Sequence, residues 1–447
     1  MALVSRKSTP EPAPGRLDDP RIRVSGHIVD VSPQAFRVAG LSPFLRLGDC
    51  IVADGPEGEE LGEVVRIEES AATVKPFAVR FQSGVRSVAW RTGPVTLSPA
   101  ESWRGRTINA FGHPCDDLGP LEQGPTPRVA DTQPDGAMKR GRIREPVQTS
   151  VKAIDIFTPL IKGQRLGIFA GSGVGKSTLM GMLARAQGFD TVVVALVGER
   201  GREVREFLEE TMKGQLHRCV TVVATGDESP MMRRLAPKTA MAIAEYFRDL
   251  GQSVLLIVDS VTRLAHAARD VALAAGEPPV ARGYPPSVFS DLPRLLERAG
   301  PGPEGTGTIT GIFAVLVDGD DHNEPIADAI RGTLDGHIVL DRRIAEEGRF
   351  PAIDVLKSIS RLADLSWNPQ ERELVVRLRA MIARFEDTKD LRLLGGYQRG
   401  ADATLDQAVD LVPHLYGALV QHPQDEVTTE PFEELSRRLK AGMVQAG

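Results

Sequence analysis

The chain of 447 residues has few cysteines, no excess of positive charge and no long apolar run. Its cysteines, Cys50, Cys115 and Cys219, lie far apart, without the paired spacing of a zinc site or a disulfide framework. The net charge of −6 argues against a protein that mainly coats nucleic acid. The longest apolar runs, such as 191–197 and 254–258, are too short to cross a membrane, and the N-terminus lacks the apolar core of a secretory signal. We therefore expect a cytoplasmic protein that binds no nucleic acid and contacts membranes only peripherally.

The composition and length instead favour a globular chain with several cores. Apolar residues make up 41% and charged residues 26%, and 447 residues exceed what one core serves, so two or three domains are expected. Residues 1–20 are rich in proline, serine and charge, which is typical of a flexible leader that orders on a partner. Across 21–97, short β-like runs alternate with turn signals, which predicts a small barrel or sandwich. Its balanced charge lacks the interleaved basic and aromatic residues of an RNA-binding barrel.

The pattern changes to alternating strands and helices over residues 98–366. The run 191–197 is almost wholly apolar, as a buried parallel strand should be, and 230–250 reads as a long helix. Further strands are expected at residues 219–224, 253–258 and 311–317. This alternation predicts an α/β domain with a parallel sheet covered by helices on both faces. From 367 to 447 only amphipathic helical segments remain, at residues 370–385, 404–419 and 431–440.

The most informative segment is FAGSGVGKST, residues 169–178, which follows a strand-like run and precedes a helical pattern. A glycine-rich turn that ends in Lys-Ser wraps backbone N–H groups around nucleotide phosphates. In such a turn Lys176 reaches the outer phosphates and Ser177 takes a position on Mg²⁺. The helix N-terminus favours the same anions. The sequence therefore predicts binding of a nucleoside triphosphate with Mg²⁺, and Ala170 stands where the strict motif has glycine. The predicted phosphate-binding residues are Ala170, Gly171, Ser172, Gly173, Val174, Gly175, Lys176, Ser177 and Thr178.

Hydrolysis also needs carboxylates at the phosphates, and two acids follow predicted strands. Asp259 ends an apolar run at the sheet edge where ligands gather, so it can hold the magnesium shell, although it could simply open a turn. Glu199 follows a neighbouring apolar run, so it can orient the attacking water. It is equally well explained as a solvated acidic residue at the start of a helix. Arg200 and Arg263, behind these acids, either contact the γ-phosphate or pair with the acids.

Five segments together carry a resemblance to a known family: AGSGVGKS, VGERGREVREF, LLIVDSVTR, GEPPVARGYPPSVFSDLPRLLERAG and RFPAIDVLKSISR. They look like the rotary-type ATPase superfamily, and within it the chain most resembles the type III protein-export ATPases, the flagellar ones in particular. The similarity runs from about residue 23 to residue 400, and the stretch at 276–300 is long and nearly gapless against the export pattern. It implies a β-barrel, a RecA-like nucleotide domain and a helical C-terminal domain, assembled as a hexameric ring.

The resemblance also implies roles for single residues around the phosphates. Lys176 and Ser177 match the phosphate lysine and the magnesium hydroxyl, and Asp259 matches the magnesium-shell aspartate. Glu199 matches the glutamate that activates water. The two arginines named above match arginines near the γ-phosphate.

Three further residues match positions outside the phosphate site. Arg361, in SISR, matches the arginine finger that one subunit offers to its neighbour's nucleotide. Phe350 stands where the family places an aromatic ring against adenine, and Tyr397 would close the other side of that pocket. The alternatives are that Arg361 bridges to a local carboxylate and that both aromatic residues belong to the core.

One chain carries both Glu199 and Arg361, whereas in the resembling F-type ring these two roles lie on different polypeptides. A ring of identical subunits can then build every site, each borrowing its finger from the next copy. We expect a homohexamer with head-to-tail contacts that close. Since an in-trans finger contributes on the order of 10³–10⁵ in turnover, an isolated monomer should be a poor enzyme.

The favoured hypothesis is an ATPase at the cytoplasmic face of a flagellar type III export gate, peripheral to the inner membrane, that releases chaperones and delivers substrates. The resemblance implies several partners. They are a stator-like regulator at the leader, a central coiled-coil stalk, the export gate, and chaperone–substrate complexes at the C-terminal domain.

Three alternatives stay open. An injectisome ATPase shares the export signature. A catalytic subunit of an ion-translocating ATP synthase fits the phosphate residues, but Arg361 on the same chain and the 276–300 segment argue against it. A ring helicase would need a basic, aromatic barrel, which residues 21–97 do not offer.

Overall fold

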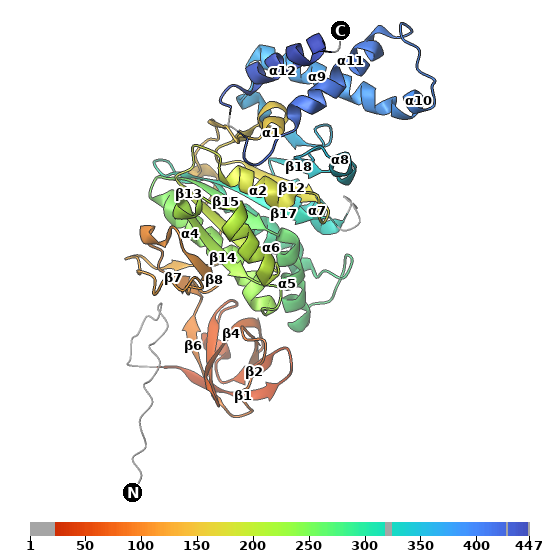
Figure 1. Ribbon diagram of the computed structural model, residues 1–447. Coiled ribbons are helices and arrows are strands. Elements are labelled where there is room, and N and C mark those ends of the chain that lie inside the picture. The colour runs from red at the N-terminus through yellow and green to blue at the C-terminus, as the bar shows by residue number, and fades with distance from the viewer. Residues whose placement is uncertain (1–22, 318–323, 426–427, 446–447) are drawn as a thin grey trace.

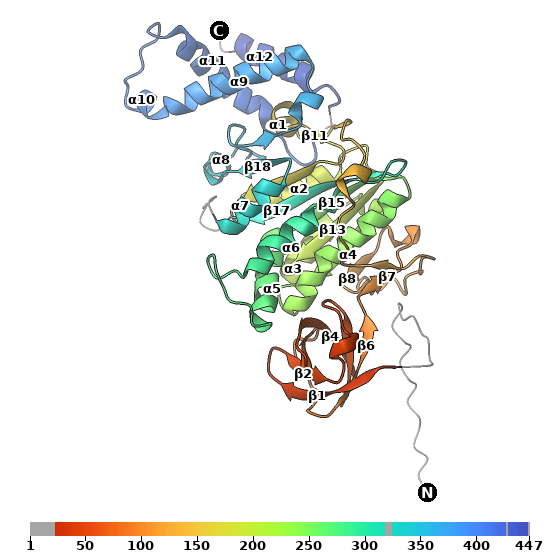
Figure 2. The ribbon, with the colours of Figure 1, turned by 180° about the vertical axis from the view of Figure 1, so that it is seen from behind.

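The computed structural model describes residues 23–317, 324–425 and 428–445. A barrel lies at one end, an α/β region in the middle and a helical region at the other end (Figures 1 and 2). This is the predicted fold class. The leader predicted at 1–20 lies outside the described residues, and the domain boundaries after residues 97 and 366 stay predictions.

Six antiparallel strands close the N-terminal barrel in the order β1-β2-β5-β4-β3-β6. The strands are β1 Ser25–Val31, β2 Phe36–Ala39, β3 Cys50–Gly55, β4 Gly58–Ile67, β5 Ala71–Pro76 and β6 Val88–Gly93. Alternate residues point inward, and Ile28, Phe36 and Ile51 are among those that fill the barrel core. The barrel alternative is therefore confirmed and the sandwich alternative is wrong. The sequence pattern missed β2, whose four residues are too few for a clear alternation.

The central sheet has nine strands, in the order β19-β18-β12-β17-β15-β13-β14-β8, with β16 beside β17. The strands from β18 to β8 in this order are all parallel. Their bounds are β8 Thr107–Asn109, β12 Arg165–Ala170, β13 Thr191–Val197, β14 Cys219–Ala224, β15 Ser253–Asp259, β17 Thr308–Leu316 and β18 Gly336–Leu340. The antiparallel members are β16 Gly300–Pro301 and β19 Ile359–Ser360. Every residue of β13 is buried, as the apolar run predicts.

Two further pairs of short strands flank the sheet. They are β7 Thr96–Leu97 with β9 Arg128–Val129, and β10 Pro146–Val147 with β11 Leu160–Ile161.

Helices cover both faces of the sheet and form two separate cores. Val193 and Ala195 of β13 belong to the first core, together with side chains of α4 Pro230–Asp249, α5 Val261–Ala274, α6 Pro286–Leu296 and α7 Pro325–Thr333. Val192 and Val194 belong to the second core, with side chains of α1 Lys152–Phe157, α2 Lys176–Ala184 and α3 Gly201–Glu206. The two-residue repeat of a strand explains this division. A π-helical turn, Phe207–Thr211, follows α3.

The C-terminal region consists of the helices α9 Pro369–Asp387, α10 Lys389–Leu393, α11 Ala403–Leu419 and α12 Pro431–Gln445, and α8 Arg342–Glu346 precedes them. Side chains of α9, α11 and α12 pack on the second core. α9 begins at a capping box in which Asn368 and Glu371 bond each other's backbone. The three predicted helical segments are confirmed. Across the described ranges, no helix is long and apolar enough to span a membrane.

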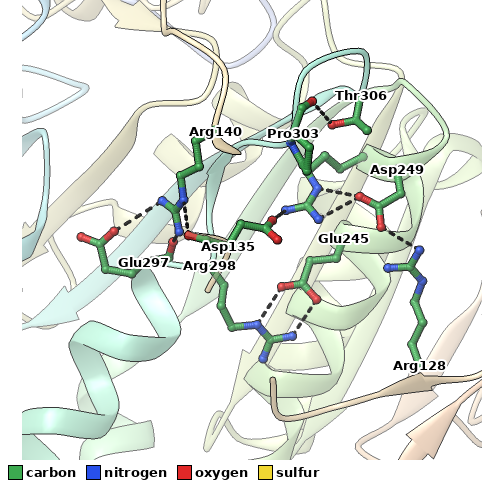
Figure 3. A network of polar contacts seen from close by, with 10 residues as sticks. Arg128, Asp135, Arg140, Glu245, Asp249, Glu297, Arg298, Pro303 and Thr306 are labelled. Atoms are coloured by element: carbon green, nitrogen blue, oxygen red, sulfur yellow. Dashed lines mark hydrogen bonds and ion pairs between the residues drawn. The ribbon is translucent and has the colours of Figure 1, made fainter. Parts of the chain in front are cut away.

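A network of ion pairs fastens the C-terminal end of α4 to the segments around it (Figure 3). Arg298 donates to both carboxylate oxygens of Glu245 on α4, at 2.8 and 2.9 Å, and to the carbonyl of Ala130 at 2.9 Å. Its side chain is only 1% exposed. Because the pair is buried, removing one partner would leave the other charge without compensation.

We predict that Arg298→Met lowers the free energy of unfolding by about 3–5 kcal/mol, because it leaves Glu245 buried without its cation. Arg399→Met is the matched control, since its pair with Asp410 is 74% and 45% exposed and should contribute less than about 1 kcal/mol. Urea unfolding followed by circular dichroism measures both changes. Equal shifts in the two variants would contradict the prediction.

Candidate active site

The glycine-rich loop joins β12 to α2 and leaves backbone N–H groups open at the start of that helix. Gly173 and Gly175 have φ of 78° and 93°, the left-handed region that glycine tolerates best. Ala170 is the buried last residue of β12 and lacks a positive φ, so alanine fits where the strict motif has glycine. Gly175 caps α2 without a side-chain hydrogen bond. The first N–H groups of α2 can therefore bind an anion.

Three predicted residues meet beside this loop although they come from distant parts of the sequence. The Nζ atom of Lys176 contacts Oδ1 of Asp259, the last residue of β15, and lies 3.8 Å from Oε1 of Glu199, which follows β13. The side chain of Asp259 is 4% exposed. Parallel pairing brings the ends of β13 and β15 to one edge of the sheet, so both carboxylates lie near the same ammonium group.

The electrostatics of this cluster make Glu199 a group that titrates near neutrality. Partial burial and the negative charge of Asp259 raise the pKa of Glu199 from 4.5 to about 7, while Lys176 acts in the opposite direction. A carboxylate with such a pKa is suited to accept a proton from water at physiological pH.

The donor atoms present fit Mg²⁺ only as part of a nucleotide complex. Ser177 is exposed in the first turn of α2, and its hydroxyl and the carboxylate of Asp259 are hard oxygen donors of the kind Mg²⁺ prefers. Across the ranges that the structure describes, no group of three or more His, Cys, Asp or Glu side chains could hold a metal ion. Phosphate oxygens and water would have to complete the coordination.

The two predicted arginines lie in different surroundings. The side chain of Arg263, on α5, packs against Gly198, where an added Cβ would be 3.1 Å from its Cβ and Cγ atoms. Arg263 therefore lies beside the end of β13. Arg200 is 86% exposed and pairs with Glu203 at 3.6 Å, an exposed contact that holds it weakly.

Phe350 lies next to the phosphate loop, but Tyr397 does not. Ring carbons of Phe350 are 3.7 and 3.8 Å from where a Cβ on Gly175 would stand, and Phe350 lines a cavity of about 420 Å³. Gln421 donates its backbone N–H to the carbonyl of Phe350 at 2.8 Å. Tyr397 is absent from the cavity lining, and its hydroxyl donates to Oδ1 of Asp406 at 2.6 Å.

The aromatic residue that shares the cavity with Phe350 is Tyr416, on α11. Tyr416 is not among the site residues predicted from the sequence. Its place among the apolar positions of α11 gives the same signal as a core residue. Only the packing of α11 against the nucleotide-binding region shows that Tyr416 lines this cavity.

Arg361 lies apart from the phosphate loop of its own chain. It is exposed and follows β19, the edge strand of the sheet, where its N–H donates to the carbonyl of Asp335 at 2.9 Å. It lines a cavity of about 240 Å³ with Phe157 and Trp367, and no residue of the phosphate loop belongs to that lining.

The fold and the loop geometry define a RecA-like P-loop nucleotide-binding protein. Residues 150–360 match the ATP synthase alpha/beta family, nucleotide-binding domain, and residues 367–441 match the T3SS EscN ATPase C-terminal domain.

Individual relatives extend this match to nearly the whole chain. It is 55% identical over 440 residues to the flagellum-specific ATP synthase of Rhizobium meliloti (strain 1021), covering 98% of this chain and 92% of the relative. It is 46% identical over 377 residues to the SPI-2 type 3 secretion system ATPase of Salmonella typhimurium, covering 83% of this chain and 85% of that relative. The chain belongs to the family of flagellum-specific ATP synthases. The resemblance found in the sequence is confirmed.

Solved structures agree with this assignment. The assembled ATPase EscN from the enteropathogenic E. coli type III secretion system matches with a TM-score of 0.85 at 39% identity, covering 93% of this chain and 100% of that chain. EscN in complex with its central stalk EscO matches with a TM-score of 0.83 at the same identity.

We predict that kcat/KM for ATP falls as pH is lowered from about 8 to about 6, because Glu199 becomes protonated below its pKa of about 7 and can no longer accept a proton. Steady-state hydrolysis across this range measures the profile, and binding of a fluorescent ADP analogue, measured in parallel, should change little. A kcat/KM that stays flat across the range would contradict this role of Glu199.

Proposed function

We propose that this chain hydrolyses ATP with Mg²⁺ in a ring of identical subunits and that the hydrolysis serves flagellar protein export. The observation that carries the proposal is the meeting of Lys176, Glu199 and Asp259 beside the phosphate loop. It occurs in a chain 55% identical to a flagellum-specific ATP synthase over nearly its full length.

The contacts suggest how the side chains divide the work. Without nucleotide, Lys176 neutralises Asp259. When ATP enters the loop, its phosphates offer Lys176 a stronger partner, and the carboxylate of Asp259 is released toward the magnesium shell together with the hydroxyl of Ser177. Mg²⁺ held by Ser177 and Asp259 would supply neutralisation of phosphate charge. Glu199 orients the attacking water and accepts its proton, and Arg263 lies close enough to the end of β13 to reach the γ-phosphate side.

Arg361 is proposed to complete the site of the neighbouring subunit. It is exposed at the β19 edge, and the cavity of about 240 Å³ that it lines includes no residue of its own phosphate loop. A head-to-tail ring would bring this edge to the next copy's nucleotide. The solved EscN relative is an assembled ATPase, which supports the ring. The exposed, weakly paired Arg200 is proposed to act at the same boundary.

We propose that the adenine ring packs against the side chain of Phe350. The second aromatic wall is assigned to Tyr416 in preference to Tyr397, because Tyr416 lines the cavity and Tyr397 is bonded to Asp406 outside it.

The proposed partners follow the relatives. A stalk in the ring centre is supported by the complex of EscN with its central stalk EscO. A stator-like regulator at residues 1–20, the export gate, and chaperone–substrate complexes at 367–447 remain part of the proposal, as does a cytoplasmic place beside the inner membrane. The proposed domains are 21–97, 98–366 and 367–447.

Among the alternatives, the injectisome role is favoured less than the flagellar one, since identity is 46% to the SPI-2 ATPase against 55% to the flagellar relative. The match of residues 367–441 to a type III secretion C-terminal domain argues against a subunit of an ion-translocating ATP synthase.

We predict that Glu199→Gln keeps ATP binding but loses hydrolysis by about 10²–10⁴-fold, because the amide cannot accept the proton. Lys176→Ala should instead weaken ATP binding itself, since it removes the cation that faces the phosphates. Binding of a fluorescent ATP analogue and phosphate release separate the two effects. Retained turnover in Glu199→Gln would remove this residue from its role.

The same Glu199→Gln allele distinguishes the cellular roles. If the flagellar assignment is correct, replacing the wild-type gene with this allele reduces motility and flagellin secretion. Normal motility combined with lost secretion of other substrates would favour the injectisome alternative.

Mixing two inactive variants tests whether two subunits share one catalytic site. Glu199→Gln and Arg361→Ala should each be nearly inactive alone, yet mixed in equal amounts they should recover about one quarter of wild-type activity. In random rings that fraction of interfaces joins an intact Glu199 to an intact Arg361. Phosphate release after co-assembly measures the recovery. The control is Glu199→Gln mixed with Lys176→Ala, which lie in the same half-site and should recover nothing. A mixture as inactive as its components would contradict the shared site.

A further inference from the structure

The loop between β14 and α4, residues 225–229, is hydrogen-bonded to the backbone of Glu199. Gly226 donates its N–H to the carbonyl of Glu199 at 3.0 Å, and Gly198 donates to the carbonyl of Ala224 at 2.7 Å. The approach is close, because a Cβ added to Gly226 would lie 3.1 Å from the carbonyl oxygen of Gly198. The position of this loop therefore sets the position of the Glu199 backbone.

The other end of the loop is fastened to the barrel. Ser229 donates its hydroxyl to the carbonyl of Phe77, which directly follows β5, at 2.6 Å. The same oxygen accepts the N–H of Met232 at 3.2 Å and so caps α4. Inside the loop, the carboxylate of Glu228 accepts the N–H of Thr225 at 3.0 Å. The loop is thus hydrogen-bonded to the backbone of Glu199 at one end and to the barrel at the other.

Charged side chains of other segments form ion pairs with α4 along its length. Arg234 pairs with Glu63 of β4, and the two side chains are 14% and 15% exposed. Lys238 pairs with Asp131 at 2.5 Å. At the far end, Arg248 pairs with Asp135 at 3.0 Å. Of these pairs, only Arg234–Glu63 joins α4 to the barrel, so a movement of the helix relative to the barrel would break this largely buried pair, which is costly.

We propose that the barrel positions Glu199 for hydrolysis through α4 and the 225–229 loop, so that turnover depends on how the barrel is docked. Glu63, Arg234 and Ser229 are positioning residues in this path, and Gly226 is its contact with Glu199. The inference rests on the proposed role of Glu199. Misplacement of a reacting group by about 1 Å can cost about 10²-fold in rate, so small shifts suffice. Anything that binds the barrel and tilts it would change kcat without touching nucleotide.

The first test acts at the end of the path nearest Glu199. Gly226→Ala adds a methyl group that displaces the Gly198 carbonyl by a few tenths of an ångström. We expect kcat of the assembled full-length chain to fall about tenfold, with KM for ATP and affinity for a fluorescent ADP analogue within about twofold of wild type. Gly332→Ala is the control, because nothing lies within 4 Å of its added Cβ.

The second test acts at the barrel, more than a hundred residues away in sequence from Glu199. Glu63→Gln weakens the pair with Arg234, and Asp49→Asn weakens the pair with Arg91 within the same barrel, in which the Asp49 carboxylate is 4% exposed. Both variants should lower the melting temperature, but only Glu63→Gln should lower kcat at unchanged KM. The double variant Glu63→Gln/Gly226→Ala should lose less than the product of the single losses, since both act on one path.

The outcomes separate this inference from the proposed function. If Glu199→Gln is inactive while Gly226→Ala and Glu63→Gln keep wild-type kcat, the path is wrong and the role of Glu199 stands. If Glu63→Gln and Asp49→Asn lower kcat equally, the barrel contributes stability alone and the inference is again wrong. Retained turnover in Glu199→Gln overturns both.

Discussion

Parallel strand pairing is the constraint on which the site depends. β12, β17, β15 and β13 lie side by side in one direction, so their C-terminal ends form a single edge. Lys176 begins the helix after the first of these strands, and Asp259 and Glu199 end or follow two others. Any antiparallel member among them would carry its carboxylate to the opposite edge. The hydrophobic runs that bury these strands therefore also determine which polar residues meet.

One ammonium group between two carboxylates makes the cluster responsive to its ligand. Lys176 lies against Asp259 and within 3.8 Å of Glu199, and this arrangement compensates only part of the negative charge. Glu199 consequently keeps a raised pKa. If triphosphate binds Lys176 and Mg²⁺ binds beside Asp259, as proposed, the balance of charge around Glu199 would change with occupancy. A base whose protonation depends on the bound ligand suits an enzyme that must hydrolyse only when loaded.

Much of this site could be predicted from the sequence because each residue directly follows a local pattern. Lys176 and Ser177 end a glycine-rich turn, and Asp259 and Glu199 end or follow apolar runs. For Glu199 the residues alone fit a solvated acid equally well, and the family resemblance gave it its predicted role. Tyr416 and the Arg234–Glu63 pair have no such local signal. Their partners are distant in the chain, and an aromatic residue on a helix or a buried arginine looks the same in sequence whether it serves the core or a site.

β2 and the placement of Tyr397 illustrate the same limit. A strand of four residues is too short to show its alternation, and a tyrosine in a glycine-rich loop can face any of several neighbours. The helices with longer periodic patterns are predicted nearly at their observed bounds, because burial imposes the pattern over many residues.

Both flanking regions reach the nucleotide site through the backbone rather than through reacting groups. The barrel holds the loop that bonds Glu199, and the helical region holds Phe350 through the N–H of Gln421 while adding Tyr416 to its cavity. Under the proposed roles, the nucleotide-binding region receives one constraint at Glu199 and another at Phe350. In the proposed ring, Arg361 would add a third constraint that the neighbouring copy supplies. Chemistry would then be conditional on three separate contacts, which is the arrangement expected where ATP use must be restricted to an assembled machine.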